Sequence, residues 1–253
     1  MTQAWFDFDI RTDPVFQEIV KPFIENQMAE MAAYDRQRQA INPDIKYIFH
    51  EHAERVAKDV RNVAARLGQP EHVQEAMYWA MLAHDLGKKT LPVQIWDSEG
   101  KPTGEDKTLR RSHAERGLSL IDEIIGNPYE QPGQNNEPPN GYRNFLELMR
   151  DVMTNHHEHI DGSGHHGLRG EQISTSVRLC CIVEGYDGYT IERPHDKVTP
   201  RDRSPAGALH RMRTDPDKGA KMYDLDLLEA FTALKLATAE QKPAQAKQPG
   251  QKF

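Results

Sequence analysis

Histidines gather between Asn155 and Leu168, a stretch that reads NHHEHIDGSGHHGL. A neutral imidazole offers a nitrogen lone pair near neutral pH, which makes histidine the commonest metal-binding side chain. The adjacent pair His156 and His157, followed by a glycine-rich segment, is typical of two ligands at a helix end that face an open loop. A metal site built on this pair needs further ligands from elsewhere in the chain.

Other ligand-type side chains fall on the apolar stripes of predicted helices. Apolar residues recur at steps of three and four over residues 45–67, which predicts an amphipathic helix that Gly68 ends. The same pattern predicts helices over 71–86 and 106–125, and two more that begin near residues 142 and 171. These five helices carry the following candidate ligands: His52, His84 with Asp85, His113, His156 with His157, and Glu184 with Asp187 one turn on.

A single histidine on an apolar stripe is more often a core residue with a satisfied hydrogen bond. Five coincidences favour a metal site over a buried polar network, because an unpaired carboxylate such as Glu184 is costly in an apolar interior. Mixed imidazole and carboxylate ligands suit iron, manganese or zinc better than calcium or magnesium. Asp85 is the natural bridge between two metals, which lie roughly 3.5–4 Å apart in hydrolytic two-metal sites.

The elements that must position these residues indicate an all-α fold, since the sequence shows no useful length of strand alternation. Residues 14–38 predict a further helix with a kink at Pro22, and shorter helical patterns cover 202–213 and 222–237. Segments rich in proline and glycine predict loops over 90–105 and 127–141. We divide the chain into an N-terminal helical extension (1–40), a main domain (41–237) and a disordered tail (238–253).

The chain has 253 residues and a formal net charge of −7, which argues against a nonspecific nucleic-acid binder. No apolar run reaches the roughly 20 residues of a membrane helix, and the N-terminus lacks the signal-peptide pattern, so we expect a cytoplasmic protein. Cys180 and Cys181 are neighbours, which excludes a disulfide framework and favours small buried residues. Basic residues outnumber acidic ones between 193 and 213, which fits a solvated surface or a phosphate-facing patch.

His84-Asp85-Leu86-Gly87-Lys88 resembles the signature of the HD phosphohydrolase superfamily. The wider set of motifs is similar to the HD-GYP branch, whose members are cyclic di-GMP phosphodiesterases. The similarity covers roughly residues 45–235. It includes His52–Val56, Leu91-Pro92, His113 ahead of Gly117, His156–Glu158, Asp161–Gly164, Gly167–Gly170, Arg178 and Arg193-Pro194. The resemblance implies an HD-domain helical bundle for the main domain.

The resemblance also implies roles at the matching positions. One metal would be held by His52, His84, Asp85 and Glu184, and a second by Asp85 with His113, His156 and His157. Both would be divalent transition-metal ions, with iron or manganese favoured and zinc or nickel allowed. Lys88 would contact the substrate phosphate and act with Asp85 in catalysis. Arg178 and Arg193 are either structural or substrate-binding residues.

Three departures from the family pattern stand out. Gly164-His165-His166 replaces the Gly-Tyr-Pro that names the branch. Glu184 stands where the family has aspartate, with Asp187 as an alternative ligand. Ile48 replaces a glutamate that some members carry four residues before the first histidine, which argues for two metals and not three.

These observations predict a metal-dependent phosphodiesterase in which a hydroxide bridging two metals attacks phosphorus. Cyclic di-GMP is the substrate that the resemblance implies, and the altered loop leaves other cyclic dinucleotides, linear dinucleotides or nucleotide monoesters open. No proton donor for the leaving oxygen is evident beyond His159, His165 and His166. The alternatives are a catalytically inert nucleotide-binding or scaffold module and, less favoured, a structural zinc site. The partner is then a small nucleotide, with a protein partner or a homodimer contacted through residues 1–40.

Overall fold

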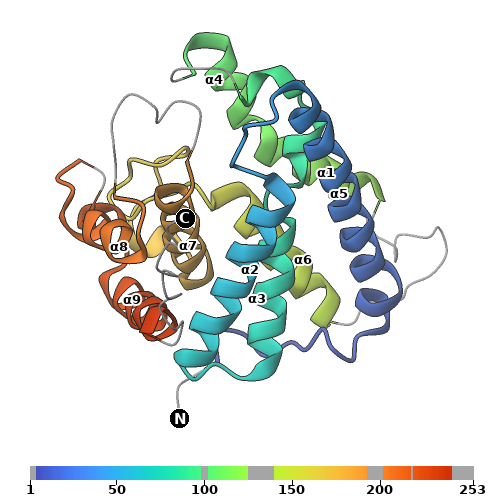
Figure 1. The fold of residues 1–253 in the computed structure, drawn as a ribbon. Coiled ribbons are helices and arrows are strands. Elements are labelled where there is room, and N and C mark those ends of the chain that lie inside the picture. The colour runs from blue at the N-terminus through green and yellow to red at the C-terminus, as the bar shows by residue number, and fades with distance from the viewer. Residues whose placement is uncertain (1–3, 98–101, 125–139, 193–201, 218, 241–253) are drawn as a thin grey trace, which may run out of the picture.

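An antiparallel pair of helices, α2 (Phe49–Arg66) and α3 (Glu71–Ala83), forms the centre of the fold (Figure 1). This computed structural model describes residues 4–97, 102–124, 140–192, 202–217 and 219–240. Within these ranges the chain forms helices and turns but no strand, which confirms the all-α prediction. The buried side chains of α2 recur at steps of three and four, and Gly68, with a φ of 74°, turns the chain toward α3.

Further helices cover this pair (Figure 1). α6 (Asn140–Asn155) packs on α3, and α7 (Thr175–Thr190) packs on α2. α5 (His113–Ile124) packs on α6 and on the 3₁₀ helix η2 (Leu86–Thr90), while α7 also contacts α8 (Pro205–Thr214) and α9 (Leu225–Glu240). The remaining short elements are η3 (Val93–Ile95), α4 (Gly104–Arg111), η4 (Gly170–Gln172) and η6 (Ala220–Met222).

The N-terminal extension shares the core of the central pair. A π-helical turn, η1 (Phe16–Val20), leads into α1 (Lys21–Ile41), which packs on α2, α3, η2 and η3. The kink expected at Pro22 stays a prediction; the π hydrogen bonding of η1 changes to α hydrogen bonding at Lys21, and Pro22 is the second residue of α1. Phe16, Ile24 and Met31 are buried in the main hydrophobic cluster.

A buried guanidinium ties α1 to the rest of the chain. Arg38 donates to Asp35 Oδ1 at 2.7 Å and, through two nitrogens, to both carboxylate oxygens of Asp97 at 2.9 and 2.7 Å. Asp35 Oδ2 in turn accepts from the backbone N–H of His50, at the start of α2. The guanidinium carbon of Arg38 lies 3.7 Å from the ring centre of Phe49. Breaking a buried pair of this kind is strongly destabilising because it leaves a charge without compensation.

Several helix ends differ from the prediction. α3 ends at Ala83 and not at 86, and the helix expected over 106–125 is two helices, α4 and α5, that break at Ser112. α7 begins at Thr175, because the side chain of Ser174 caps it by accepting from the N–H of Val177. α9 continues to Glu240, three residues into the expected disordered tail, and residues 241–253 lie outside the described part. Most of the loop expected over 127–141 also lies outside it.

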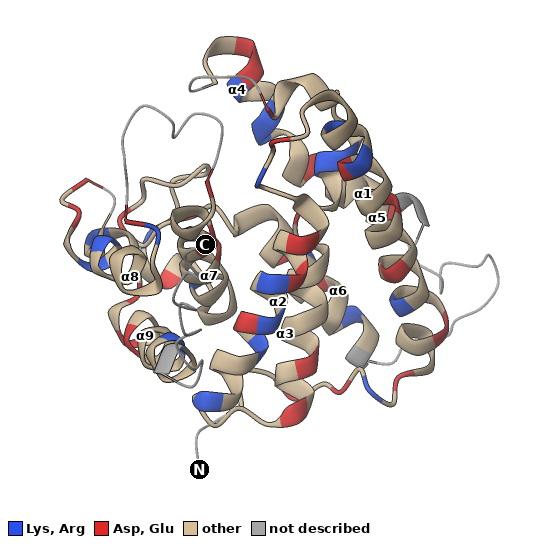
Figure 2. Cartoon of the chain, in the orientation of Figure 1, with Lys and Arg blue, Asp and Glu red and all other residues tan. Residues whose placement is uncertain are grey.

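Acidic and basic residues are interspersed along the helices (Figure 2). No helix in the described ranges combines the length and the apolar character that a membrane span requires.

Two glycines let η2 and α5 approach at backbone contact. A Cβ atom added to Gly87 would lie 1.8 Å from the carbonyl oxygen of His113 and 2.5 Å from the amide nitrogen of Gly117. A Cβ added to Gly117 would lie 3.1 Å from the amide nitrogen of Gly87 and 2.6 Å from the terminal methyl of Met153. The close approach holds His113 beside the segment that carries Asp85, so these glycines help to position the side chains of the candidate centre.

We expect Gly87→Ala to destabilise the protein by about 1–3 kcal/mol or more, because rigid backbone atoms occupy the space of the new methyl group. Gly117→Ala should cost less, because the flexible end of Met153 can move aside. Thermal unfolding of the metal-free variants, followed by circular dichroism, checks this order. A smaller loss of melting temperature for Gly87→Ala than for Gly117→Ala would contradict the account.

Candidate metal centre

The first group of candidate ligands joins α2 to the end of α3. His52 comes from the apolar face of α2, His84 caps the C-terminus of α3, and Asp85 follows it. All three side chains are buried, and each offers a ligand atom within 4.8 Å of the others. The structure therefore brings together residues more than thirty positions apart in a form that could hold one metal ion.

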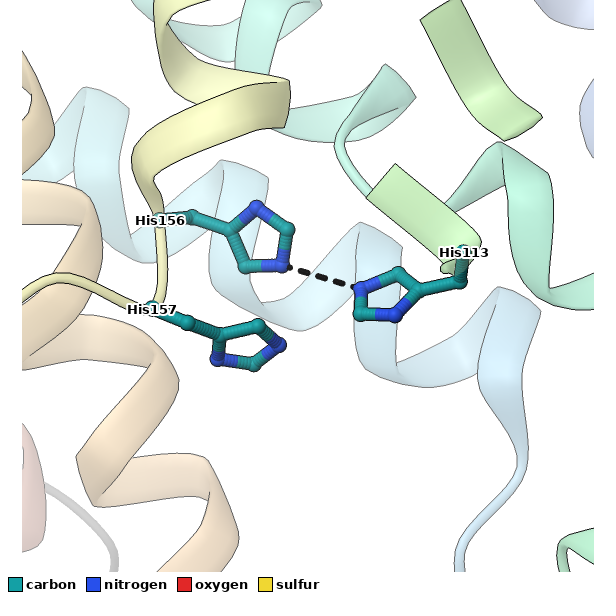
Figure 3. Close-up of side chains that lie close together, drawn as sticks. All are labelled: His113, His156 and His157. Atoms are coloured by element: carbon teal, nitrogen blue, oxygen red, sulfur yellow. Dashed lines mark hydrogen bonds between the residues drawn. The ribbon is translucent and has the colours of Figure 1, made fainter. Parts of the chain in front are cut away.

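The second group lies across Asp85 and consists of histidines alone (Figure 3). His113 opens α5, and His156 and His157 directly follow α6. The Nε2 atoms of His113 and His156 face each other at 3.3 Å, as the dashed line in Figure 3 shows. These three residues also place ligand atoms within 4.8 Å of one another.

The carboxylate of Asp85 stands between the two groups and turns one oxygen to each. Its Oδ2 lies 3.4 Å from His52 Nε2 and 3.1 Å from His84 Nε2. Its Oδ1 lies 3.2 Å from His113 Nε2 and 3.8 Å from His156 Nε2. This is the arrangement in which one carboxylate can bridge two cations.

Hydrogen bonds on the far side of each ring fix which nitrogen faces the centre. The Nδ1–H of His84 donates to the carbonyl of Met81 at 2.6 Å, that of His113 to Arg110 at 2.7 Å, and that of His156 to Met153 at 2.9 Å. A neutral ring that donates from Nδ1 presents a lone pair at Nε2. Carbonyl and carboxylate partners of this kind orient metal-binding histidines.

Glu184 and Asp187 take different places around His52. Glu184 Oε2 lies 2.8 Å from His52 Nε2 and 3.5 Å from His84 Nε2, on the inner side of the ring. Asp187 Oδ2 accepts from His52 Nδ1 at 2.6 Å, on the outer side, while its Oδ1 accepts from Arg55. The sequence left both acids open as the ligand, and the geometry gives Glu184 the position beside the candidate ligands and Asp187 the position behind them.

Polar atoms without partners test whether these residues fit a cation. Among the described residues, the buried atoms that lack any hydrogen-bond partner include His52 Nε2, His84 Nε2, Asp85 Oδ1 and Glu184 Oε2. Acceptors that face acceptors in a buried site are unfavourable unless a positive charge lies between them. The donor set therefore fits divalent metal ions, and imidazole with carboxylate is a suitable mixture for transition metals.

Charges in the centre are strongly coupled. Burial opposes ionisation of Asp85 and Glu184, but the neighbouring histidines and Lys88 hold the pKa of both carboxyls well below their usual range. Burial likewise opposes protonation of His52, yet Glu184, Asp187 and Asp85 raise its pKa to about 10. Burial and the other imidazoles lower the pKa of His156 to about 3. At neutral pH a proton and a metal cation thus compete for the inner side of His52, whereas His156 is neutral and ready to bind.

Lys88 lies within the centre, beside a pocket. Its ammonium pairs with Asp85 Oδ2 and lies 3.5 Å from the hydroxyl oxygen of Tyr47. The rings of Tyr47, Phe49 and Trp96 surround it, with centroids 5.0–5.9 Å from Nζ. Lys88, His113, His157 and Glu184 line a pocket of about 490 Å³.

Of the two arginines that the sequence left as structural or substrate-binding, only Arg178 lies in the described part of the chain, and it does not line this pocket. Arg178 donates to the carbonyls of Ile173 and Gly170 at 2.8 and 3.0 Å and pairs with Asp224 at 3.2 Å. These contacts tie the loop before α7 to the start of α9, which is a structural role. Arg193 lies outside the described residues.

The glycine-rich loop depends on a residue that the sequence reasoning gave no role. Glu158 is fully buried, and its carboxylate accepts from the backbone N–H groups of His166 at 2.6 Å and Leu168 at 2.8 Å. Gly164 packs so closely that an added Cβ would lie 2.5 Å from the Cα of Glu158. A glutamate between histidines, without a basic partner nearby in sequence, was the signal that could have identified this loop anchor.

The histidines of this loop have separate surroundings. His159 Nδ1 lies 3.0 Å from the hydroxyl of Ser163. The ring centroid of His165 lies 4.7 Å from that of His157, and His165 lines the pocket. Burial and the charge of Arg111 lower the pKa of His165 to about 4, so its ring is neutral at neutral pH. His166 lines an adjoining pocket of about 230 Å³.

Comparison with known families matches the HD-domain family model to residues 43–218. A cyclic di-GMP phosphodiesterase of Thermotoga maritima is 25% identical over 186 residues, which cover 73% of this chain and 44% of that protein. A cyclic di-GMP phosphodiesterase of Pseudomonas aeruginosa is 31% identical over 136 residues, which cover 53% of this chain and 28% of that protein. The chain thus spans less than half the length of these curated relatives.

A solved structure of an HDG"Y"P protein from Bdellovibrio bacteriovorus resembles the fold with a TM-score of 0.55. The two sequences are 16% identical, and the match covers 87% of this chain and 66% of that chain. At this identity the likeness shows the fold alone.

We expect Asp187→Asn to weaken metal binding about 10- to 100-fold, because His52 loses the charged acceptor that orients its ring. Titration of the metal-free protein with Mn²⁺ or Zn²⁺ against a competing chelator measures the affinity. Asp59→Asn is the matched control, since Asp59 lies on α2, pairs with Lys235 and forms no hydrogen bond or ion pair with a candidate ligand among the described residues. Wild-type affinity in Asp187→Asn, or equal losses in both variants, would contradict the assigned role.

Proposed function

The chain belongs to the HD-domain family, and from this premise we propose that it is a metal-dependent phosphodiesterase that hydrolyses a cyclic dinucleotide, cyclic di-GMP or a close relative. The curated relatives described above support the reaction and the substrate class. They are longer proteins, so the activity of this chain rests on its own site.

The observation that carries the proposal is the division of the Asp85 carboxylate between two histidine groups. His52, His84 and Glu184 would hold one divalent ion with one oxygen of Asp85, and His113, His156 and His157 would hold a second with the other. Iron or manganese is the favoured metal, and zinc or nickel also accepts this donor set. When bound, such ions supply a water of lowered pKa and positive charge for the phosphoryl oxygens.

The residues of the chain perform the remaining tasks. Lys88 is buried beside Asp85 and opens onto the pocket, where its ammonium can pair with a nonbridging phosphate oxygen. The aromatic rings of Tyr47, Phe49 and Trp96 limit the water around that ammonium, which strengthens its interaction with an anion. His165 is neutral at neutral pH, which suits contact with substrate better than proton donation to the leaving oxygen.

Metal-loaded protein should convert cyclic di-GMP into the linear dinucleotide or GMP, as followed by liquid chromatography. The panel should include the mixed cyclic GMP–AMP, cyclic di-AMP and a nucleotide monoester. Binding without turnover across the panel would replace the enzyme with an inert binding module. Turnover of the monoester alone would keep the hydrolase and reject the cyclic substrate.

We expect Lys88→Met to lower kcat about 10²- to 10³-fold, because a preorganised positive charge on the phosphoryl oxygens is lost. Lys89→Met is the matched control, since the neighbouring lysine pairs with Glu30 of α1. Metal content, measured by elemental analysis, separates an effect on the phosphate from an effect on Asp85. Unchanged kcat in fully metal-loaded Lys88→Met would refute the role of Lys88.

A further inference from the structure

The pocket above the candidate metal centre has a basic wall that the proposed chemistry does not use. The pocket is lined by His113, His157 and Glu184 of the centre and, from α4, by Lys107, Arg110 and Arg111. α4 is the short helix that the sequence pattern merged with α5. The break at Ser112 is what separates the helix that carries this wall from the helix that carries His113.

The charges in this pocket do not balance. Lys88 pairs with Asp85, and both carboxylates of the pocket lining have partners: Asp97 is bound by Arg38, and Glu184 lies against His52. Lys107 and Arg111 line this pocket, and neither forms an ion pair with an acidic side chain in the described part of the chain. In a chain with a net charge of −7, a concave surface with surplus positive charge selects for an anionic ligand.

Arg111 occupies the boundary between two cavities. It lines the pocket of about 490 Å³ and also the adjoining pocket of about 230 Å³, and His165 lines both as well. A ligand that fills the first pocket and continues past His165 therefore passes Arg111.

A cyclic dinucleotide carries two phosphodiesters, and only one can lie at the metal centre when it is cleaved. Resting on the function proposed above, we infer that Arg111 binds the second phosphate, the one that is not cleaved. A guanidinium suits this task because its planar fork can donate two hydrogen bonds to one phosphate. Lys88 of η2 and Arg111 of α4 then each bind one of the two phosphates. The pair of residues selects for substrates that carry two phosphates.

The test compares substrates with two phosphates and with one. For Arg111→Ala we expect the KM for cyclic di-GMP to rise about 10- to 100-fold with kcat within a factor of about 2, as for loss of one charge-assisted hydrogen bond. The KM for bis(4-nitrophenyl) phosphate, which has a single phosphate, should rise far less. Arg111→Lys should recover part of the loss. Arg66→Ala, an exposed arginine at the end of α2, is the control for loss of one positive charge.

Equal KM increases for both substrates, or no increase for cyclic di-GMP, would overturn the role of Arg111 and leave the proposed phosphodiesterase intact. Binding measured by calorimetry separates the two ideas if the wild-type protein is inert. Arg111→Ala should then lose affinity for cyclic di-GMP and not for 3′,5′-cyclic GMP. Wild-type protein that neither binds nor cleaves cyclic di-GMP would refute both.

Discussion

A buried carboxylate that faces imidazole lone pairs on two sides is the constraint on which the rest of this structure depends. Asp85 is 1% exposed, and an isolated anion at such a place would be expelled or protonated. Lys88 compensates for part of the charge, but Asp85 Oδ1 still lacks a hydrogen-bond partner among the described residues. The Nδ1–H groups of His84, His113 and His156 already donate to backbone carbonyls on the far side of the rings. The remaining positive charge must therefore come from protons or metal ions.

The same bonds explain where the helices end. The carbonyls that accept from His84, His113 and His156 belong to Met81, Arg110 and Met153, which lie in the last turns of α3, α4 and α6. Last-turn carbonyls have no partner within their own helix, so a histidine just beyond the end satisfies one of them. The rings of His84 and His156 are thereby oriented by the helices that they follow, and the ring of His113, the first residue of α5, by the preceding helix α4. The centre is assembled from helix termini, which lets three elements meet at one carboxylate.

The overall fold and the convergence of the candidate ligands could be predicted from the sequence, because both follow from apolar periodicity and residue type. The family match confirms the resemblance to HD phosphohydrolases, and the seven side chains expected at the centre do lie together. Helix ends were predicted less well. The periodicity of 106–125 continues through Ser112, and nothing in it reveals that His113 takes the carbonyl of Arg110.

Roles that depend on direction could not be predicted from spacing. Glu184 and Asp187 are three residues apart on one helix, and only their opposite approaches to His52 distinguish them. Arg178 fits a phosphate-binding pattern in sequence, yet its guanidinium is taken up by two carbonyls and Asp224. Glu158 anchors a loop through backbone amides, a contact that side-chain patterns do not encode. In each case the residue type could be interpreted from the sequence, but the partner of the side chain could not be predicted.

The N-terminal extension also contributes to the site by compensating a buried charge. The family match begins at residue 43, yet Arg38 of α1 binds Asp97 and lies against Phe49, and both of these line the pocket. The hydroxyl of Tyr34 donates to the carbonyl of Leu91, in the segment that leads to Trp96. Without α1, Asp97 would lose its ion pair with Arg38. Phe49, one of the aromatic rings around Lys88, would lose its contact with the same guanidinium. Residues 16–41 therefore help to form the pocket, because Arg38 of α1 neutralises the charge of Asp97 in the pocket lining.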